Sequence, residues 1–238
     1  MSVLTSAPRF RRTASGIALI VSPVLFSAAE MLAPEQQDNN AKQLAVYAAH
    51  RSALLASSFF SITVALVLIV GTVGLVHLVR ACGVTYANLA AVFVAYGLVF
   101  AHAALGGVNL MFAEMVKPGL DRTAMLSLYD SLMHDVTLAA PLLLGHYIFV
   151  VGLILLAVAL LRAKTGPRWA AVCVLLFPVS DVILGNFPVT RLADIVSGGF
   201  AVAGFAGLGV YLLRMSDVQW ETVAVDQVEG RRTDPVPA

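Results

Sequence analysis

The chain has 238 residues, of which 59% are hydrophobic and 12% are charged, with a formal net charge of +1 at pH 7. Soluble globular domains carry roughly 25% charged residues, so this composition excludes an ordinary soluble domain and indicates an integral membrane protein. A near-zero net charge without a basic stripe also gives no reason to expect nucleic-acid binding.

Apolar runs long enough to cross a bilayer, which takes about 20 residues, recur six times along the chain. They cover residues 16–33, 52–79, 84–113, 136–161, 169–187 and 195–213. Because helices satisfy their own backbone hydrogen bonds in lipid, the sequence predicts an all-α, polytopic transmembrane helix bundle of six spans. The expected organisation is an N-terminal segment 1–15, a transmembrane domain 16–214 and a polar, disordered tail 215–238.

Lysine and arginine are distributed unevenly between the segments that connect these spans. With the N-terminus inside, ten lie on the cytoplasmic side: Arg9, Arg11, Arg12, Arg80, Arg162, Lys164, Arg168, Arg214, Arg231 and Arg232. Five lie on the outer side: Lys42, Arg51, Lys117, Arg122 and Arg191. The positive-inside rule therefore predicts that both termini are cytoplasmic. Cys82 and Cys173 then lie toward the reducing side, where a disulfide is not expected.

The first span has an alternative interpretation as a secretory signal peptide. Its basic start and apolar core are followed by Ser27-Ala28-Ala29, a small-residue sequence at which cleavage could occur. We favour an uncleaved span, and cleavage would leave the other five spans in the same orientation.

Two outer connections are predicted to contain short helices. In "DRTAMLSLYDSLMHD", between spans three and four, one face is apolar and consists of Met125, Leu128, Tyr129 and Leu132. This pattern predicts an amphipathic helix along the membrane surface. Before the second span, Asn40 is the expected N-cap of another short helix.

Small residues inside the spans are expected to mark the faces where helices pack closely. They include Gly71, Gly74, Gly106, Gly107, Gly198, Gly199, Gly204, Gly207 and Gly209.

Ionisable side chains near the bilayer centre cost about 2.5 kcal/mol or more, so their positions are informative. The outer half of the predicted bundle contains Glu30, Glu114, Asp135, Asp181, Asp194, His50, His102, His134 and His146. An interfacial position at a helix end accounts for Glu114, Asp135, Asp194, His50 and His134. It does not account for His102, His146 or Asp181, which lie deeper.

His102 and His146 are expected at nearly the same depth, about 15 Å from the outer ends of spans three and four. Consecutive helices are usually neighbours, so the two imidazoles are predicted to face each other inside the bundle. Asn109 follows His102 on the same helical face at i+7. Asp181 is expected about 9 Å from the outer end of span five, just beyond Pro178.

Three interpretations of this set remain open. The histidines could be neutral and structural, bonded to each other, to Asn109 or to a free carbonyl. They could line, with Asp181, an outward-facing cavity for a lipophilic or cationic molecule. They could also hold a b-type haem across two helices, although a single histidine pair is weak support.

The function that these residues favour is non-enzymatic. The sequence predicts a membrane protein with an outward-facing polar pocket, formed by His102, Asn109, His146 and Asp181, for a small lipophilic or cationic ligand. The expected partners are the bilayer and that ligand, with no metal and no cofactor. The alternative is an intramembrane enzyme that acts on an isoprenoid-like substrate by carboxyl acid/base chemistry, with Glu30, Glu114 and Asp181 as candidates. A proton-coupled transporter is disfavoured because the spans show no convincing repeat.

Three segments carry a resemblance to a known group of proteins: "RRTASGIALIVSPVLF", "YAAHRSALLASS" and "PRWAAVCVLLFPV". Together they resemble an uncharacterised multi-pass membrane protein family of high-GC Gram-positive bacteria, over most of residues 11–214. The resemblance implies a helical bundle in the bacterial cytoplasmic membrane. It transfers no catalytic residue.

Overall fold

The computed structural model describes residues 6–79, 84–184 and 190–222. Within these ranges every regular element is a helix, which confirms the all-α prediction. In chain order they are α1 (Ser6–Leu32), α2 (Asn40–Ala49), α3 (Arg51–Val79), α4 (Val84–Gly97), η2 (Leu98–Ala103), α5 (Ala104–Met115), α6 (Arg122–Met133), α7 (Val136–Ala163), α8 (Arg168–Leu184), α9 (Thr190–Ala201), η3 (Val202–Ala206) and α10 (Gly207–Arg214).

Five helical stretches of the described residues are long and apolar enough to cross a membrane. They are Ala7–Leu32, Arg51–Val79, Thr85–Met115, Val136–Ala163 and Leu192–Arg214. The described part of the fifth predicted span is α8, which has 17 residues; residues 185–187 of that span lie outside the described residues. The structure therefore supports a multi-pass membrane protein with five candidate spans, rather than six clear ones.

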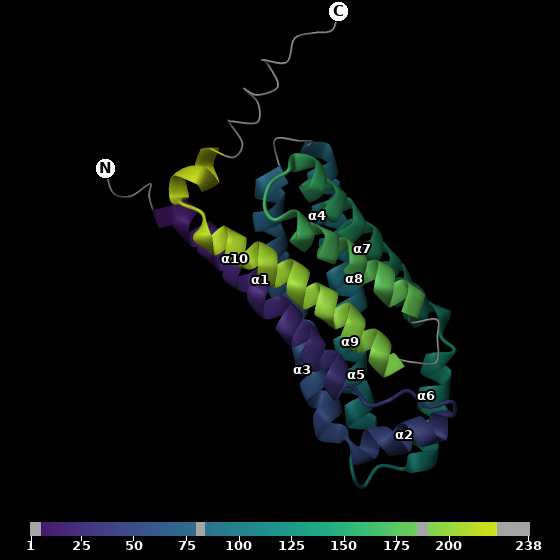
Figure 1. Cartoon of the computed structure of the whole chain (residues 1–238). Coiled ribbons are helices and arrows are strands. Elements are labelled where there is room, and N and C mark those ends of the chain that lie inside the picture. Colours follow the sequence, from purple (N-terminus) through teal and green to yellow (C-terminus); the bar gives the residue numbers. More distant parts are fainter. Residues whose placement is uncertain (1–5, 80–83, 185–189, 223–238) are drawn as a thin grey trace, which may run out of the picture.

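The bundle has two distinct ends (Figure 1). At one end, called here the terminal end, α1 begins and α10 finishes; α2 and α6 lie at the opposite end, called the α2–α6 end. Arg12 joins the two chain ends: its Nη1 donates to the carbonyls of Leu212 and Leu213, each at 3.0 Å, and its Nη2 lies 2.9 Å from Asp217 Oδ1. Helix α1 starts ten residues before the span predicted from hydropathy, which places Arg12 in its second turn.

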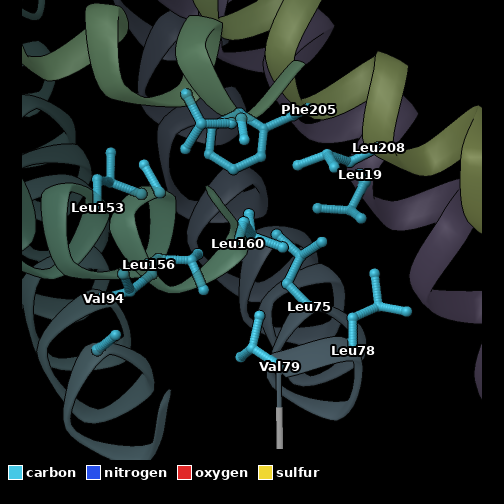
Figure 2. Packing of buried hydrophobic residues seen from close by; sticks show 14 of the residues in the cluster. Leu19, Leu75, Leu78, Val79, Val94, Leu153, Leu156, Leu160, Phe205 and Leu208 are labelled. Atoms are coloured by element: carbon cyan, nitrogen blue, oxygen red, sulfur yellow. The ribbon is translucent and has the colours of Figure 1, made fainter. Parts of the chain in front are cut away.

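Leucines form the centre of the bundle (Figure 2). The fully buried leucines of this cluster come from four helices and include Leu19 of α1, Leu75 of α3, Leu156 of α7 and Leu208 of α10. Lipid tails are as apolar as leucine, so burial of these side chains gains dispersion contacts rather than escape from water. Close complementarity between helices is therefore the main source of stability in this region.

A close helix contact joins the third and fourth predicted spans. A Cβ atom built on Gly97 would lie 2.4 Å from Cβ of Phe149, and one built on Gly145 would lie 2.5 Å from Cβ of Phe100. Both α4 and η2 pack along α7, which confirms that these consecutive spans are neighbours. Gly107, expected to mark a packing face, has no such neighbour within 4 Å.

Two candidate spans contain a short π-helical segment, η2 in the third and η3 in the last. Such segments are often found at functional sites because they change the direction of the side chains that follow. His102 lies within η2, and Phe205 lies within η3.

A second, smaller cluster at the α2–α6 end packs Tyr47 of α2 and Tyr129 of α6 against Phe112 of α5. Burial raises the pKa of the Tyr47 hydroxyl, and burial together with the neighbouring Tyr47 raises the pKa of Tyr129. Both phenols therefore stay protonated around neutral pH.

The predicted amphipathic helix between spans three and four is confirmed as α6, although Leu128 on its apolar face is exposed.

Helix α2 begins one residue earlier than expected. Its N-cap is Asn39, whose side chain accepts hydrogen bonds from the N–H groups of Ala41 and Lys42, so the assignment of this role to Asn40 was wrong. The Asn40 side chain instead donates to Asp130 Oδ1 of α6 at 2.6 Å.

The start of the predicted disordered tail is folded. Residues 217–222 are helical, and Trp220 is buried with its ring stacked on His77 at a centroid distance of 4.1 Å. His77 Nε2 donates to the Trp220 carbonyl at 2.8 Å. The rest of the predicted tail, 223–238, lies outside the described residues.

Candidate functional site

A cavity of about 320 Å³ lies in the half of the bundle nearer the α2–α6 end. Its walls come from the third and fourth candidate spans together with α1, α8 and α9. They consist of Phe26, Glu30, Ala101, His102, Leu105, Leu142, Leu143, His146, Asp181, Asp194 and Ser197. Three of the four predicted pocket residues, His102, His146 and Asp181, therefore line one cavity.

Local structure fixes the position of each polar group. Glu30 lies in the last turn of α1, four residues after Phe26, so both project from one helical face. His146 follows Gly145, whose close contact with Phe100 holds α7 against η2. Asp181 is three residues beyond Pro178 within α8.

The His102 ring is held between two aromatic side chains. It makes edge-to-face contacts with Phe26 and Phe149 at centroid distances of 5.5 and 5.2 Å. Among the described residues its ring nitrogens have no hydrogen-bond partner, although His102 lines the cavity. His102 is half-buried, and a partly desolvated imidazole without a partner is costly, so the cavity is where its nitrogens can bond to water or a ligand.

His146 and Asp181 form a loose pair across the cavity wall. His146 Nε2 lies 3.7 Å from Asp181 Oδ2, too far for a direct hydrogen bond but close enough for an ion pair when the imidazole is protonated. The two side chains are 39% and 37% exposed, so a polar group can reach them. The pair is accessible rather than sealed in the protein interior.

Acidic groups dominate the described lining of the cavity. Glu30, Asp181 and Asp194 contribute carboxyl groups, and no lysine or arginine is among the described lining residues. A concave surface lined by one sign of charge, with apolar walls, concentrates the opposite charge. The cavity therefore has the electrostatic character of a cation site.

A smaller void of about 10 Å³ adjoins the cavity and shares Phe26 and His102 with it. Its walls are otherwise apolar except for Ser22, which is 1% exposed and whose Oγ has no hydrogen-bond partner among the described residues. This volume suits about one water molecule, which could bond to both Ser22 and His102. Polar groups therefore continue beyond the cavity, from His102 to Ser22, toward the centre of the bundle.

Two of the predicted residues lie elsewhere. Asn109 is not part of the cavity lining. Leu105, three residues after His102, still lines the cavity, whereas Asn109 lies about 10 Å further along the helix, where α5 packs against α3. Glu114, a candidate acid/base group, forms ion pairs with Arg51, at 3.0 Å, and with Lys117.

Phe26, Asp194 and Ser197 line the cavity although sequence reasoning did not assign them to it. Their spacings contained a usable signal: Phe26 precedes Glu30 by four residues, and Asp194 precedes Ser197 by three. Each pair falls on one helical face.

No group of three or more histidine, cysteine, aspartate or glutamate side chains among the described residues is arranged to hold a metal ion. Comparison of the chain with family models, curated proteins and solved structures gave no match. The residues of the cavity are therefore the basis for its proposed chemistry.

Proposed function

We propose that this protein crosses a bacterial cytoplasmic membrane six times, with both termini inside, as the charge distribution and the sequence resemblance indicate. Helix α8 would be the additional span, the fifth in chain order. Its 17 residues extend about 26 Å, which is at the short end of the range for spanning helices. The turn before α8 lies beside α10, where Gly166 approaches Tyr211 and Leu208, while Asp181 near its other end lines the cavity.

We further propose that the cavity opens outward and binds a small organic cation. The observation that carries this proposal is the joint placement of Glu30 and Asp181, with His102 and His146, around a volume of about 320 Å³. Ligand pockets typically occupy about 300–1,000 Å³, so this one suits a compact ligand. Ionisable groups within a membrane are retained where they bind or transport, because otherwise they only reduce stability.

Each part of the lining has a role in this proposal. The carboxylates of Glu30 and Asp181 neutralise the cationic group, and the Phe26 ring offers a face to it. His146 lies beside Asp181 and forms an ion pair with it when protonated. His102 holds a water molecule or a ligand donor at the inner end of the cavity.

Tetramethylammonium is a suitable first probe, measured by calorimetry with the full-length protein in lipid nanodiscs. We expect binding to the wild type that weakens at least tenfold in Glu30→Gln and in Asp181→Asn. Glu114→Gln is the matched control, because this carboxyl lies near the same end of the bundle but pairs with Arg51 outside the cavity. Absence of binding, or equal binding by all four proteins, would overturn the proposal.

An intramembrane enzyme is the second candidate, favoured by the presence of both Glu30 and Asp181 in one cavity. One carboxyl would protonate an alkene of an isoprenoid chain, and a proton lost from the cyclised carbocation would restore it. Incubation with geranylgeraniol followed by product separation tests this directly. A product of unchanged mass and altered retention, absent with Glu30→Gln, would support it, and unchanged substrate would exclude this reaction.

A further inference from the structure

The cavity reaches the outer surface of the bundle between the third and fourth candidate spans. Leu105 of α5 and Leu143 of α7 line the cavity, yet they are 43% and 58% exposed. A side chain can do both only where the wall of the cavity meets the outside. These two leucines therefore mark a side opening, called here the Leu105–Leu143 opening.

The packing of the two spans explains why an opening occurs there. Toward the terminal end, Gly97 and Gly145 bring α4 and η2 into close contact with α7. No comparable packing joins α5 to α7; α5 packs instead against α3. The two spans therefore diverge beyond η2, at the level of the cavity.

The surface around this opening is apolar and belongs to a membrane-spanning region. Leu144 and Tyr147, on the following positions of α7, are 54% and 59% exposed. Leu143 is seven residues from the start of α7, about 10 Å along the helix axis. In a bilayer this level corresponds to acyl chains beneath the headgroups.

The inner end of the cavity is closed by contrast. Phe26 and His102 separate it from the void of about 10 Å³. Behind them, Phe177 packs edge to face on Phe26, Phe149 packs edge to face on His102, and Phe149 and Phe177 contact each other. A hydrocarbon chain attached to a bound cation cannot extend inward. It can leave through the Leu105–Leu143 opening, where it remains in contact with lipid.

From this arrangement we infer that the ligand is an amphiphile with a cationic head and an alkyl chain, which enters from the bilayer through the Leu105–Leu143 opening. This inference rests on the proposed cation site, since the head occupies the part of the cavity near Glu30 and Asp181. The chain stays between α5 and α7. Each methylene raises partitioning into the membrane about fourfold, so the bilayer concentrates such a ligand beside the opening.

The test compares two probes that share one head, tetramethylammonium and octyltrimethylammonium, in nanodiscs containing the full-length protein. Leu143→Trp narrows the opening with a bulky ring. Leu144→Trp is the matched control, because Leu144 is the next residue, is similarly exposed and is not part of the cavity lining. Leu105→Trp narrows the opening from α5 and serves if Leu143→Trp does not fold.

We expect Leu143→Trp to slow association of octyltrimethylammonium at least tenfold and Leu144→Trp to leave it unchanged. Because Leu143 lines the cavity, Leu143→Trp should also affect tetramethylammonium, but by a much smaller factor, since this probe enters from water; Leu144→Trp should change neither probe. Equal slowing of both probes, or no slowing of either, would overturn the lateral route while the cation site stands. Failure of both probes to bind the wild type would instead overturn the proposed function.

Discussion

Replacement of Gly97 by alanine is expected to force the third and fourth candidate spans apart. The new Cβ atom would lie 2.4, 2.6 and 2.7 Å from Cβ, Cα and N of Phe149. Carbon atoms in contact prefer separations of about 3.5–4.0 Å, so the helices must move apart by at least about 1 Å. Rotation of a side chain cannot relieve the overlap, because all three atoms are fixed by the backbone of α7.

The cost follows from what Phe149 contacts. Its ring packs against His102 and Phe177, so a displacement of α7 disturbs the core and the cavity together. Overpacking of a tight core costs about 1–3 kcal/mol, and the lack of any relief places Gly97→Ala near the upper end of that range. We expect the free energy of unfolding to fall by about 2–3 kcal/mol and binding of tetramethylammonium to weaken with it.

Unfolding by denaturant in mixed micelles measures this effect, with Gly107→Ala as the control. Gly107 lies in the same candidate span, but no neighbouring atom lies within 4 Å of a Cβ built there. Both variants gain the same intrinsic helix propensity of alanine over glycine, so their difference isolates the overlap with Phe149. Equal stability of the two variants would refute the close approach of α4 to α7.

Further outcomes test the orientation, the cavity and the bundle end. A reporter fused after Arg214 should be cytoplasmic, and one placed between α1 and α2 should be external; the opposite result would contradict the predicted topology. Cysteines in a His102→Cys, His146→Cys protein should be joined by a short bifunctional reagent, whereas lack of crosslinking would separate the two histidines. Purified protein should show no Soret band, and a band lost on substitution of either histidine would establish haem ligation. Arg12→Met should lower the free energy of unfolding by about 2–3 kcal/mol, because two carbonyls and Asp217 lose their donor. Arg9→Met, at an exposed position, should have little effect on unfolding by denaturant.

Composition and hydropathy were enough to identify the class of protein and the candidate pocket residues. Charge depletion and long apolar runs require a membrane environment, because no other solvent tolerates them. The cost of an ionisable group in lipid is a property of the group and its depth, both readable along the chain. For that reason His102, His146 and Asp181 could be selected without any knowledge of how the helices pack.

Tertiary structure decided which faces meet. Gly107 was predicted to mark a packing face and Gly97 was not, yet of the two only Gly97 approaches a neighbouring helix. Gly106 packs against α3, so Gly107, one residue later, faces away from it. Asn109 was assigned to the pocket because it follows His102 on one helical face, but it lies about 10 Å further along the helix, where α5 packs against α3. Trp220 lies in a polar segment that was predicted to be disordered, but it is buried in the core cluster and its ring stacks on His77. Periodicity describes one helix at a time, whereas these outcomes depend on the separation and rotation of helices relative to each other.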